Sequence, residues 1–173
     1  MPPSTEHIVL IGMMASGKTT IGRALAARLG YGFVDSDEVI QSRTGRTVRE
    51  IFATEGETAF RRLETEALLD ALEWREPLVV AAAGGVVLAE HNRLALQQRA
   101  ARIVWLTAPV DVLTERAETG GHRPLLDEDV GESMRRLYGE REPLYRNLAQ
   151  QVVASDDRPV DDIVTEIVEA LRP

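Results

Sequence analysis

The stretch Gly12-Met13-Met14-Ala15-Ser16-Gly17-Lys18-Thr19 decides the fold, because it fits the pattern G-x4-G-K-[ST] between an apolar run and an amphipathic helical pattern. The apolar run is Ile8 to Ile11, and the helical pattern begins at Thr20. Such a loop turns sharply off a strand and aims successive backbone N–H groups from a positive helix terminus, where phosphate oxygens can replace water. Lys18 adds a movable positive charge. We therefore predict a nucleoside triphosphate site; the alternative is a glycine-rich turn that only caps a helix.

Five short apolar runs alternate with longer helical stretches, and these runs predict strands. They are His7 to Ile11, Tyr31 to Val34, Leu78 to Ala82, Arg102 to Leu106 and Gln151 to Ala154. Parallel neighbours need crossover connections, and helices on both faces explain why the runs are almost wholly apolar instead of alternating. The predicted fold class is α/β, a three-layer α/β/α sandwich around a five-stranded parallel sheet.

Two helices are well defined by their apolar stripes. The first is expected to end at Gly30 in a left-handed conformation, and its stripe consists of Ile21, Ala24, Leu25 and Leu29. The tail from Pro159 to Leu171 is predicted to form one amphipathic helix that packs inward through Ile163, Ile167, Val168 and Leu171. We interpret this last helix as structural and not catalytic.

The composition limits the classes of partner. A chain of 173 residues without cysteine fits one domain over residues 1–173 in a reducing compartment, so we expect a cytoplasmic protein. Twenty Lys and Arg against 28 Asp and Glu give a net charge of −8, which argues against general affinity for nucleic acid or anionic membranes. We expect no signal peptide and no membrane span, since the longest uncharged run, Pro77 to Ala89, is too short to cross a bilayer. We also expect a monomer whose anionic ligand is captured by a local cluster of arginines.

Ligands bind beyond the carboxyl ends of the strands in open parallel sheets, and the second predicted strand is followed there by Asp35, Ser36 and Asp37. Two carboxylates spaced by one residue can point to a common side if the chain stays extended. Magnesium bound to a triphosphate keeps several waters and usually takes one protein carboxylate near the loop hydroxyl, so we assign Asp35 and Thr19 to the metal. Ser36 or Asp37 can instead cap the next helix. Asp156, after the fifth strand, is the competing metal candidate.

Paired charges occur on the helical stretch that precedes the third strand. Arg61 and Glu64, at i and i+3, can pair and hold the guanidinium fork ready for a planar anion such as a carboxylate. The alternative is an ordinary solvated ion pair, which describes Arg62 with Glu66 better.

Two pairs of residues near this stretch, one aromatic and one of glycines, each allow a structural and a ligand-binding interpretation. Phe52 and Phe60 can wall an apolar ring, but from spacing alone we interpret them as core. Gly84 and Gly85, past the third strand, indicate that a ligand or another backbone approaches closer than a Cβ allows; a tight turn is the alternative.

The segment from Thr119 to Asp129 resembles a hinged lid, because a glycine pair and Pro124 flank a basic tip with Arg123. Kinases must exclude water, and an arginine that arrives on closure can stabilise charge on the transferred phosphoryl group. Arg141, in the next helix, can reach the site from the opposite wall, unless it lies at a solvated helix end.

Taken together, these motifs resemble the shikimate kinase family. They occur in order along nearly the whole chain as Gly12 to Thr20, Asp35 to Asp37, Phe60 to Glu64, Gly84-Gly85, Arg123 to Leu126 and Arg141 to Tyr145. The resemblance implies a sheet of order 2-3-1-4-5, a substrate-binding segment at about residues 36–64 and a lid at about residues 117–130.

The resemblance also implies a role for each site residue. Shikimate would be held by Asp37, Arg61, Gly84, Gly85 and Arg141, with Glu64 orienting Arg61. ATP would lie against Ala15, Ser16, Gly17, Lys18, Thr19 and Thr20, with Arg123 reaching it from the lid and Arg116 and Arg158 flanking adenine.

The implied reaction is transfer of the γ-phosphoryl group of ATP, bound with Mg2+, to the 3-hydroxyl of shikimate. Asp37 would accept or orient the hydroxyl proton, while Lys18 and Arg123 would neutralise charge. The family usually has three consecutive glycines after the third strand, whereas this chain has Ala83 before Gly84, so a methyl group can crowd the ring or strain the backbone. Two alternatives stay open at this point: a kinase for another small hydroxy acid such as gluconate, and a nucleotide-binding regulatory module without turnover.

Overall fold

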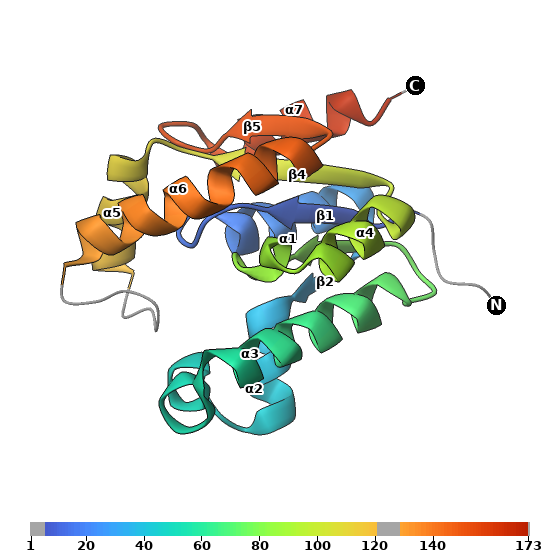
Figure 1. Cartoon of the computed structure of the whole chain (residues 1–173). Helices are drawn as coiled ribbons and strands as arrows, with labels where there is room; N and C mark the ends of the chain where they lie inside the picture. Colours follow the sequence, from blue (N-terminus) through green and yellow to red (C-terminus); the bar gives the residue numbers. More distant parts are fainter. Residues whose placement is uncertain (1–5, 121–128, 173) are drawn as a thin grey trace.

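The computed structural model describes residues 6–120 and 129–172, and a five-stranded parallel sheet lies at its centre (Figure 1). The strands are β1 (Ile8–Ile11), β2 (Gly32–Asp35), β3 (Leu78–Ala81), β4 (Arg102–Thr107) and β5 (Gln151–Ala154), in the order β2-β3-β1-β4-β5. Every neighbouring pair is parallel. The predicted fold class and strand order are confirmed, and each predicted strand boundary differs from the observed one by at most one residue.

Helices cover both faces of the sheet, as the apolar strands predicted. The helices are α1 (Lys18–Leu29), α2 (Ser36–Thr44), α3 (Val48–Leu72), α4 (Glu90–Arg99), α5 (Val110–Thr119), α6 (Val130–Leu148) and α7 (Val160–Ala170), and a short 3-10 turn, η1, spans Val86–Leu88. Side chains alternate along β1, so that Ile8 and Leu10 pack with α1 and α7 on one face, whereas Val9 and Ile11 pack with α3, α4, α5 and α6 on the other. Both faces of the central strands are therefore buried.

The two edge strands depart from the prediction that all strands are buried. β3 is buried along its whole length, but β2 is exposed or half-buried, and Val152 of β5 is 49% exposed. An edge strand has a neighbour on one side only, so helices that pack on the central strands leave part of it in water.

The two helices with well-defined stripes form as expected. Gly30 ends α1 with a φ of 69°, a conformation that costs a residue without Cβ little. α7 begins after Pro159 and buries Ile163 and Ile167. Among the helices of residues 6–120 and 129–172, none combines the length and the apolar character needed to cross a membrane.

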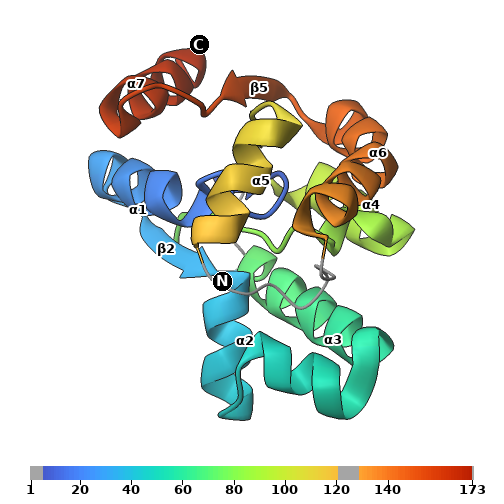
Figure 2. The ribbon, with the colours of Figure 1, turned by 90° about the vertical axis from the view of Figure 1, so that its left-hand side faces the viewer.

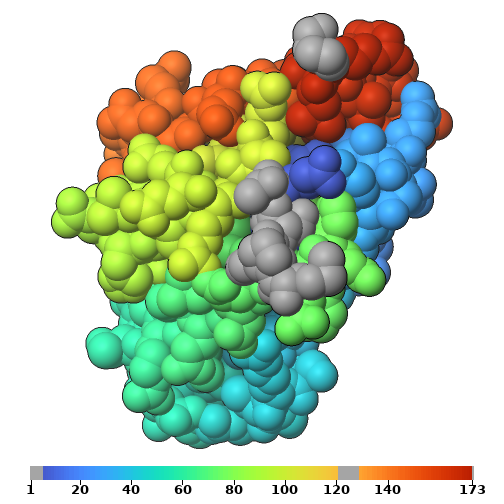
Figure 3. Space-filling model, turned by 90° about the vertical axis from the view of Figure 1, so that its right-hand side faces the viewer, coloured from blue at the N-terminus to red at the C-terminus, as the bar shows by residue number. Residues whose placement is uncertain are grey.

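α2 and the start of α3 form a separate unit beside the sheet (Figure 2). Its small core consists of Ile40, Ile51, Phe60 and Ala67. In the space-filling view this unit makes up one end of the molecule, and α7 lies at the opposite end (Figure 3). α3 is not continuous, because Gly56 has a φ of 82° and a ψ of 178° that interrupt the helix.

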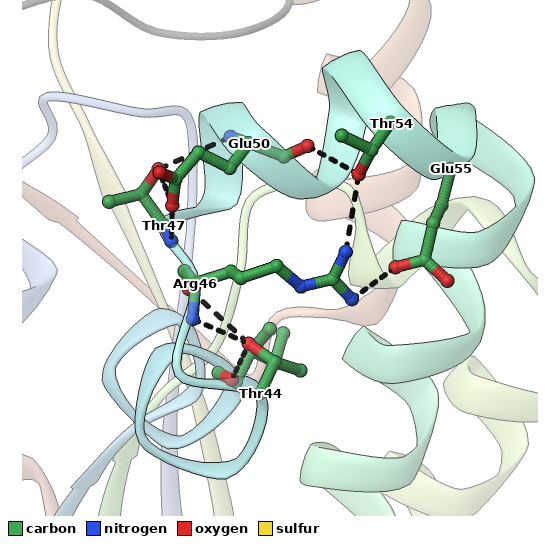
Figure 4. Close-up of polar contacts among 7 residues, drawn as sticks. Thr44, Arg46, Thr47, Glu50, Thr54 and Glu55 are labelled. Carbon is green, nitrogen blue, oxygen red and sulfur yellow. Dashed lines mark hydrogen bonds and ion pairs between the residues drawn. The ribbon is translucent and has the colours of Figure 1, made fainter.

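Polar contacts fix the turn from α2 into α3 (Figure 4). The Thr47 hydroxyl accepts the backbone N–H of Glu50 at 3.2 Å, and the Glu50 carboxylate accepts the backbone N–H of Thr47 at 2.7 Å. This reciprocal capping box satisfies two N–H groups that a helix start otherwise leaves unpaired. Arg46 ties the turn to the next stretch of helix through Thr54, at 3.2 Å, and through Glu55.

We predict that Thr47→Ala lowers the free energy of unfolding by about 1 kcal/mol, because the first turn of α3 loses its N-cap acceptor. Thr58→Ala is the control for loss of a threonine hydroxyl, since Thr58 is exposed, lies beyond the break at Gly56 and is not the N-cap of the first turn of α3. Chemical denaturation followed by circular dichroism measures both variants. Equal midpoints for Thr47→Ala and the unmodified protein would contradict the role of the cap.

Candidate active site

The phosphate loop lies between β1 and α1, and its backbone needs glycine at two positions. Gly12 has a φ of 147°, and a Cβ there would lie 2.5 Å from the carbonyl oxygen of Leu106 in β4. Gly17 caps α1 with a φ of 93°. Ala15 adopts a φ of 65°, a left-handed conformation that costs an alanine on the order of 1 kcal/mol and that clusters at functional loops. The loop is therefore held in one specific shape.

Lys18 is folded over this loop. Its ammonium group donates hydrogen bonds to the carbonyl oxygens of Gly12 and Met13, both at 2.8 Å. The charge lies at a cavity of about 280 Å³ that is lined by Ala15, Gly17, Lys18, Thr19, Thr20 and Arg116, among others. A cavity beside a helix N-terminus suits a polyphosphate, and the described residues that line this one include an ammonium group, Lys18, and a guanidinium group, Arg116.

Asp35 links the loop to α2. Its Oδ2 accepts the Thr19 hydroxyl at 2.6 Å, and its Oδ1 accepts the backbone N–H groups of Asp37 and Glu38 at 2.9 and 3.2 Å. Asp35 is thus the N-cap of α2, so the expectation that Ser36 or Asp37 caps this helix is wrong. The reason is that the helix starts directly after β2, which leaves the last strand residue in the extended conformation that an N-cap needs.

Thr19 and Asp35 also have the donor chemistry of a magnesium site. A hydroxyl and a carboxylate oxygen are hard ligands, and Mg2+ bound to phosphates keeps most of its waters, so two protein oxygens suffice. Groups of three or more His, Asp or Glu side chains that could hold a metal do not occur within the described residues. Asp156 does not line the cavity as far as the described residues define it, which removes the geometric support for it as the competing candidate.

The two arginines expected near the base of a nucleotide differ in position. Arg116 lines the cavity and donates to the carbonyl oxygens of Ser155 and Ala15, at 2.9 and 3.4 Å. Arg158 follows β5 and forms an ion pair with Glu166 at 2.7 Å. Arg158 is not among the described residues that line the cavity. Arg123 and most of the predicted lid lie outside the described residues.

A second cavity, of about 70 Å³, adjoins the first. Among the described residues, four line both cavities: Met14, Asp37, Ala83 and Gly84. The second cavity is also lined by Val48, Phe52, Phe60, Arg61, Glu64, Gly85 and Arg141. The residues expected to bind the phosphoryl acceptor therefore line one cavity, which we call the acceptor cavity. They come from α2, α3, the loop after β3 and α6.

Arg61 is held by two carboxylates of its own helix. It pairs with Glu64, whose second oxygen lies 3.1 Å from the guanidinium group, and it donates to Glu57 at 3.1 Å. A Cβ on Gly85 would lie 1.8 Å from Nη1 of Arg61, so the fork occupies the space that this glycine leaves empty. Glu64 is buried and Arg61 is partly buried, whereas Arg62 and Glu66 are exposed and lie 4.0 Å apart, which confirms the expected contrast.

Arg141 is only 2% exposed, so the alternative of a solvated helix end is wrong for this residue. It lies in the interior of α6, which continues to Leu148. Tyr145, one turn later, is fully buried and donates its hydroxyl to the carbonyl oxygen of Gly84 at 2.6 Å. A guanidinium group inside the protein is stable only near acceptors or anions, and this one faces the cavity that Glu64 and Arg61 also line.

The acceptor cavity has an unusual charge balance. Burial raises the pKa of Glu64 to about 7, and the nearby Asp37 carboxylate adds to this, while Arg61 and Arg141 act in the opposite direction. Glu64 is therefore close to half-protonated near neutral pH, beside the buried Arg141 and the partly buried Arg61. The cavity is thus prepared for one further anion beside its arginines.

Four positions lay outside the site residues predicted from sequence. Phe52 and Phe60 were interpreted as core; Phe60 is buried, but both rings line the acceptor cavity, with centroids 4.6 Å apart. Met14 has no role of its own in the loop motif, yet it lines both cavities. Tyr145 appeared only as the end of a motif. Ala83 is not among the described non-glycine residues with positive φ, so it carries no backbone strain.

This arrangement suits transfer of a phosphoryl group from one cavity to the other. Asp37 lines both cavities, so it lies beside ligands that would occupy either one. Phosphoryl transfer needs positioning and charge stabilisation more than covalent chemistry, and the cavities offer both.

Comparison with known proteins agrees with this geometry. The family model described as Shikimate kinase matches residues 14–172. A shikimate kinase of Symbiobacterium thermophilum is 43% identical over 169 residues, which cover 96% of each chain. The structure of shikimate kinase from Acinetobacter baumannii in complex with shikimate has a TM-score of 0.91 and 38% identity, and covers 96% of this chain and 92% of that one.

A gluconokinase from Sinorhizobium meliloti is more distant. Its TM-score is 0.64 at 22% identity, over 98% of this chain and 93% of that one. That level of identity indicates a shared fold alone, so it does not favour the alternative of a gluconate kinase.

We predict that Glu64 makes stability decrease as pH rises from about 4.5 to about 7. Its pKa in the folded state is raised above the ordinary value of 4.5, so the protonated form favours folding, and that contribution disappears as pH rises through the folded pKa. The contribution is on the order of 3 kcal/mol. Urea unfolding across this pH range should show that Glu64→Gln removes this slope.

Glu57→Gln is the control for that experiment, because Glu57 pairs with the same arginine but its side chain is 57% exposed. It should keep the slope of the unmodified protein. An unchanged slope in Glu64→Gln would contradict the assignment.

Proposed function

Since the chain belongs to the shikimate kinase family and is a phosphotransferase, we propose that its two adjoining cavities hold the two reactants, ATP beside the phosphate loop and shikimate beside Arg61 and Arg141. The activity is phosphorylation of the 3-hydroxyl of shikimate, which gives shikimate 3-phosphate and ADP. The observation that carries the proposal is the wall that the cavities share, because it allows direct transfer between neighbouring ligands.

The acceptor is held mainly through its carboxylate in this proposal. Arg61 and Arg141 approach the same small cavity from α3 and α6, and each can donate two parallel hydrogen bonds to a carboxylate. Glu64 orients Arg61 from its own helix. The backbone of Gly84 and Gly85 leaves room for the ring, and Phe52 with Phe60 supplies an apolar wall.

Asp37 orients the 3-hydroxyl in this proposal. It is the one carboxylate among the described residues that lines both cavities and that also lies in the first turn of α2. Because the transition state of phosphoryl transfer is loose, alignment of the hydroxyl contributes more than its early deprotonation. Asp37 then accepts the proton as the new bond to phosphorus forms.

The donor side is assigned to the phosphate loop. Residues 15–20 surround the phosphates with backbone N–H groups, and Lys18 turns from the loop carbonyls to the terminal phosphates. Family membership implies the use of ATP. Thr19 and Asp35 would hold Mg2+, which neutralises phosphate charge when bound. Arg116 stays near the base, and the roles of Arg123 and Arg158 rest on the family resemblance alone.

The organisation of the chain follows from the same assignment. We propose a single kinase domain over residues 1–173, with a substrate-binding segment at about residues 36–64 and a lid at about residues 117–130. The separate core of α2 and the start of α3 supports the first of these boundaries. The monomeric state and the cytoplasmic location stay predictions.

We predict that Arg61→Ala weakens shikimate binding about tenfold or more and leaves ATP binding unchanged, because one charge-assisted clamp is lost from the acceptor cavity only. Titration calorimetry with each ligand measures this. Arg62→Ala is the matched control, since Arg62 is the exposed neighbour with its own partner, and it should behave like the unmodified protein.

Coupled measurement of ADP release completes that test. Turnover should occur with shikimate and not with gluconate, nucleoside monophosphates or no acceptor. Unchanged shikimate affinity in Arg61→Ala, or turnover with gluconate in place of shikimate, would refute the proposed acceptor site.

We predict that Gly85→Ala lowers shikimate affinity at least about tenfold, because the added methyl group displaces the Arg61 guanidinium group. Glycine itself carries no charged side chain. The φ of Gly85 is −89°, so alanine is tolerated by the backbone, but its Cβ would overlap the Arg61 guanidinium group. ATP affinity and the midpoint of thermal unfolding should change little. Gly139→Ala is the control, because a Cβ there meets no atom within 4 Å. Normal shikimate affinity in Gly85→Ala would exclude this packing.

A further inference from the structure

The hydroxyl of Tyr145 lies behind Gly84, which is one of the residues that line both cavities. The tyrosine side chain is fully buried, and burial raises its pKa to about 12, so the hydroxyl keeps its proton at neutral pH. It donates that proton to the carbonyl oxygen of Gly84 at 2.6 Å, across 61 residues of sequence. Tyr145 itself lines neither cavity as defined by the described residues.

The phenol ring is fixed to the sheet. It stacks on Trp105 of β4, with ring centroids 5.9 Å apart and an interplanar angle of 30°. The guanidinium group of Arg146 lies 5.5 Å from the Trp105 centroid. The Arg141 guanidinium also lies close to the Tyr145 oxygen and acts by charge and hydrogen bonding to lower its pKa against the effect of burial. The hydroxyl therefore has a well-defined position.

Gly84 is the part of the wall that most needs such an anchor. It is followed by Gly85, and two successive glycines have more backbone freedom than any other pair. A Cβ built on Gly84 would lie 3.3 Å from the carbonyl oxygen of Gly12, 3.3 Å from Nη1 of Arg141 and 3.6 Å from the backbone nitrogen of Met14. Gly84 thus packs against the phosphate loop and against the arginine clamp at once.

We propose that Tyr145 is a positioning residue, whose hydroxyl holds the Gly84 carbonyl so that the shared wall keeps the acceptor hydroxyl in line with the terminal phosphorus of ATP. The inference rests on the proposed assignment of the two cavities to ATP and shikimate. Tyr145 contacts neither reactant; it acts through the Gly84 backbone, and its oxygen also has a hydrogen bond with Arg141.

Loss of the hydroxyl has a specific consequence. In Tyr145→Phe the ring still fills its place, but the Gly84 carbonyl loses its buried donor and the glycine pair can rotate. A misplacement of about 1 Å between reacting groups can cost as much as 100-fold in rate. A water molecule does not depend on this alignment, so the rate of ATP hydrolysis should rise relative to the rate of phosphoryl transfer to shikimate.

The experiment compares Tyr145→Phe with the unmodified protein at saturating ATP and shikimate. Two quantities are measured: kcat for shikimate 3-phosphate, and the ratio of ADP to shikimate 3-phosphate formed. We expect kcat to fall at least about tenfold and the ratio to rise above one, while the affinity for each ligand, from calorimetry, changes less than kcat. Partial unfolding lowers both products together and leaves the ratio unchanged.

Two further variants complete the design. Tyr138→Phe removes a half-buried hydroxyl from the same helix, away from both cavities, and should keep the normal kcat and ratio. Gly84→Ala keeps the Tyr145 hydroxyl but adds a methyl group to the same wall, against Gly12 and Arg141, and should raise the ratio as Tyr145→Phe does.

The proposal is overturned if Tyr145→Phe keeps a kcat within about twofold of normal, or if its kcat falls with an unchanged ratio, because either result leaves the residue a role in packing alone. The underlying assignment of the cavities is tested separately. If that assignment is wrong, Arg61→Ala keeps its normal shikimate affinity. The role of Tyr145 is judged from the product ratio of Tyr145→Phe.

Discussion

The parallel pairing of β1 with β3 is the constraint on which the rest of the site depends. Val9 lies opposite Val80 and Leu10 opposite Ala81, and the N–H of Ala82 continues the ladder to the Leu10 carbonyl at 3.1 Å. Two strands in this register end at the same edge of the sheet, so the loops that follow them must touch. That contact brings Gly84 against Gly12, and it makes one wall serve both the phosphate cavity and the acceptor cavity.

Electrostatics in the acceptor cavity follow from where the charges are buried and not from the total charge. The chain carries a net charge of −8, yet two guanidinium groups, those of Arg61 and Arg141, line one small cavity. Arg61 needs Glu64 for a fixed orientation, but a fully ionised Glu64 would cancel the attraction for an incoming anion. Burial reduces this conflict, because it raises the pKa of Glu64 to about 7 and so lowers the average negative charge beside Arg61 near neutral pH.

Local patterns predicted most of the fold and much of the site. The phosphate loop, the strand ends and Gly30 follow from spacing over a few residues, and the pair Arg61–Glu64 follows from helical geometry. Contacts between distant segments were not predictable in this way. The cap formed by Asp35 depends on where α2 starts, the role of Tyr145 depends on a bond to Gly84, and the place of Met14 depends on how two loops meet.

The clamp joins two cores that are otherwise distinct. Arg141 belongs to α6, which packs on the sheet, whereas Arg61 lies on α3 between the break at Gly56 and the buried Leu68. The first part of α3 packs instead with α2 around Ile51 and Phe60. A carboxylate held by both arginines therefore bridges the sheet and the α2–α3 unit. Asp37 lies on α2, so under the proposed function the same bridge would set the distance between the acceptor hydroxyl and the phosphate loop. Binding of the acid would then be coupled to alignment of the reaction.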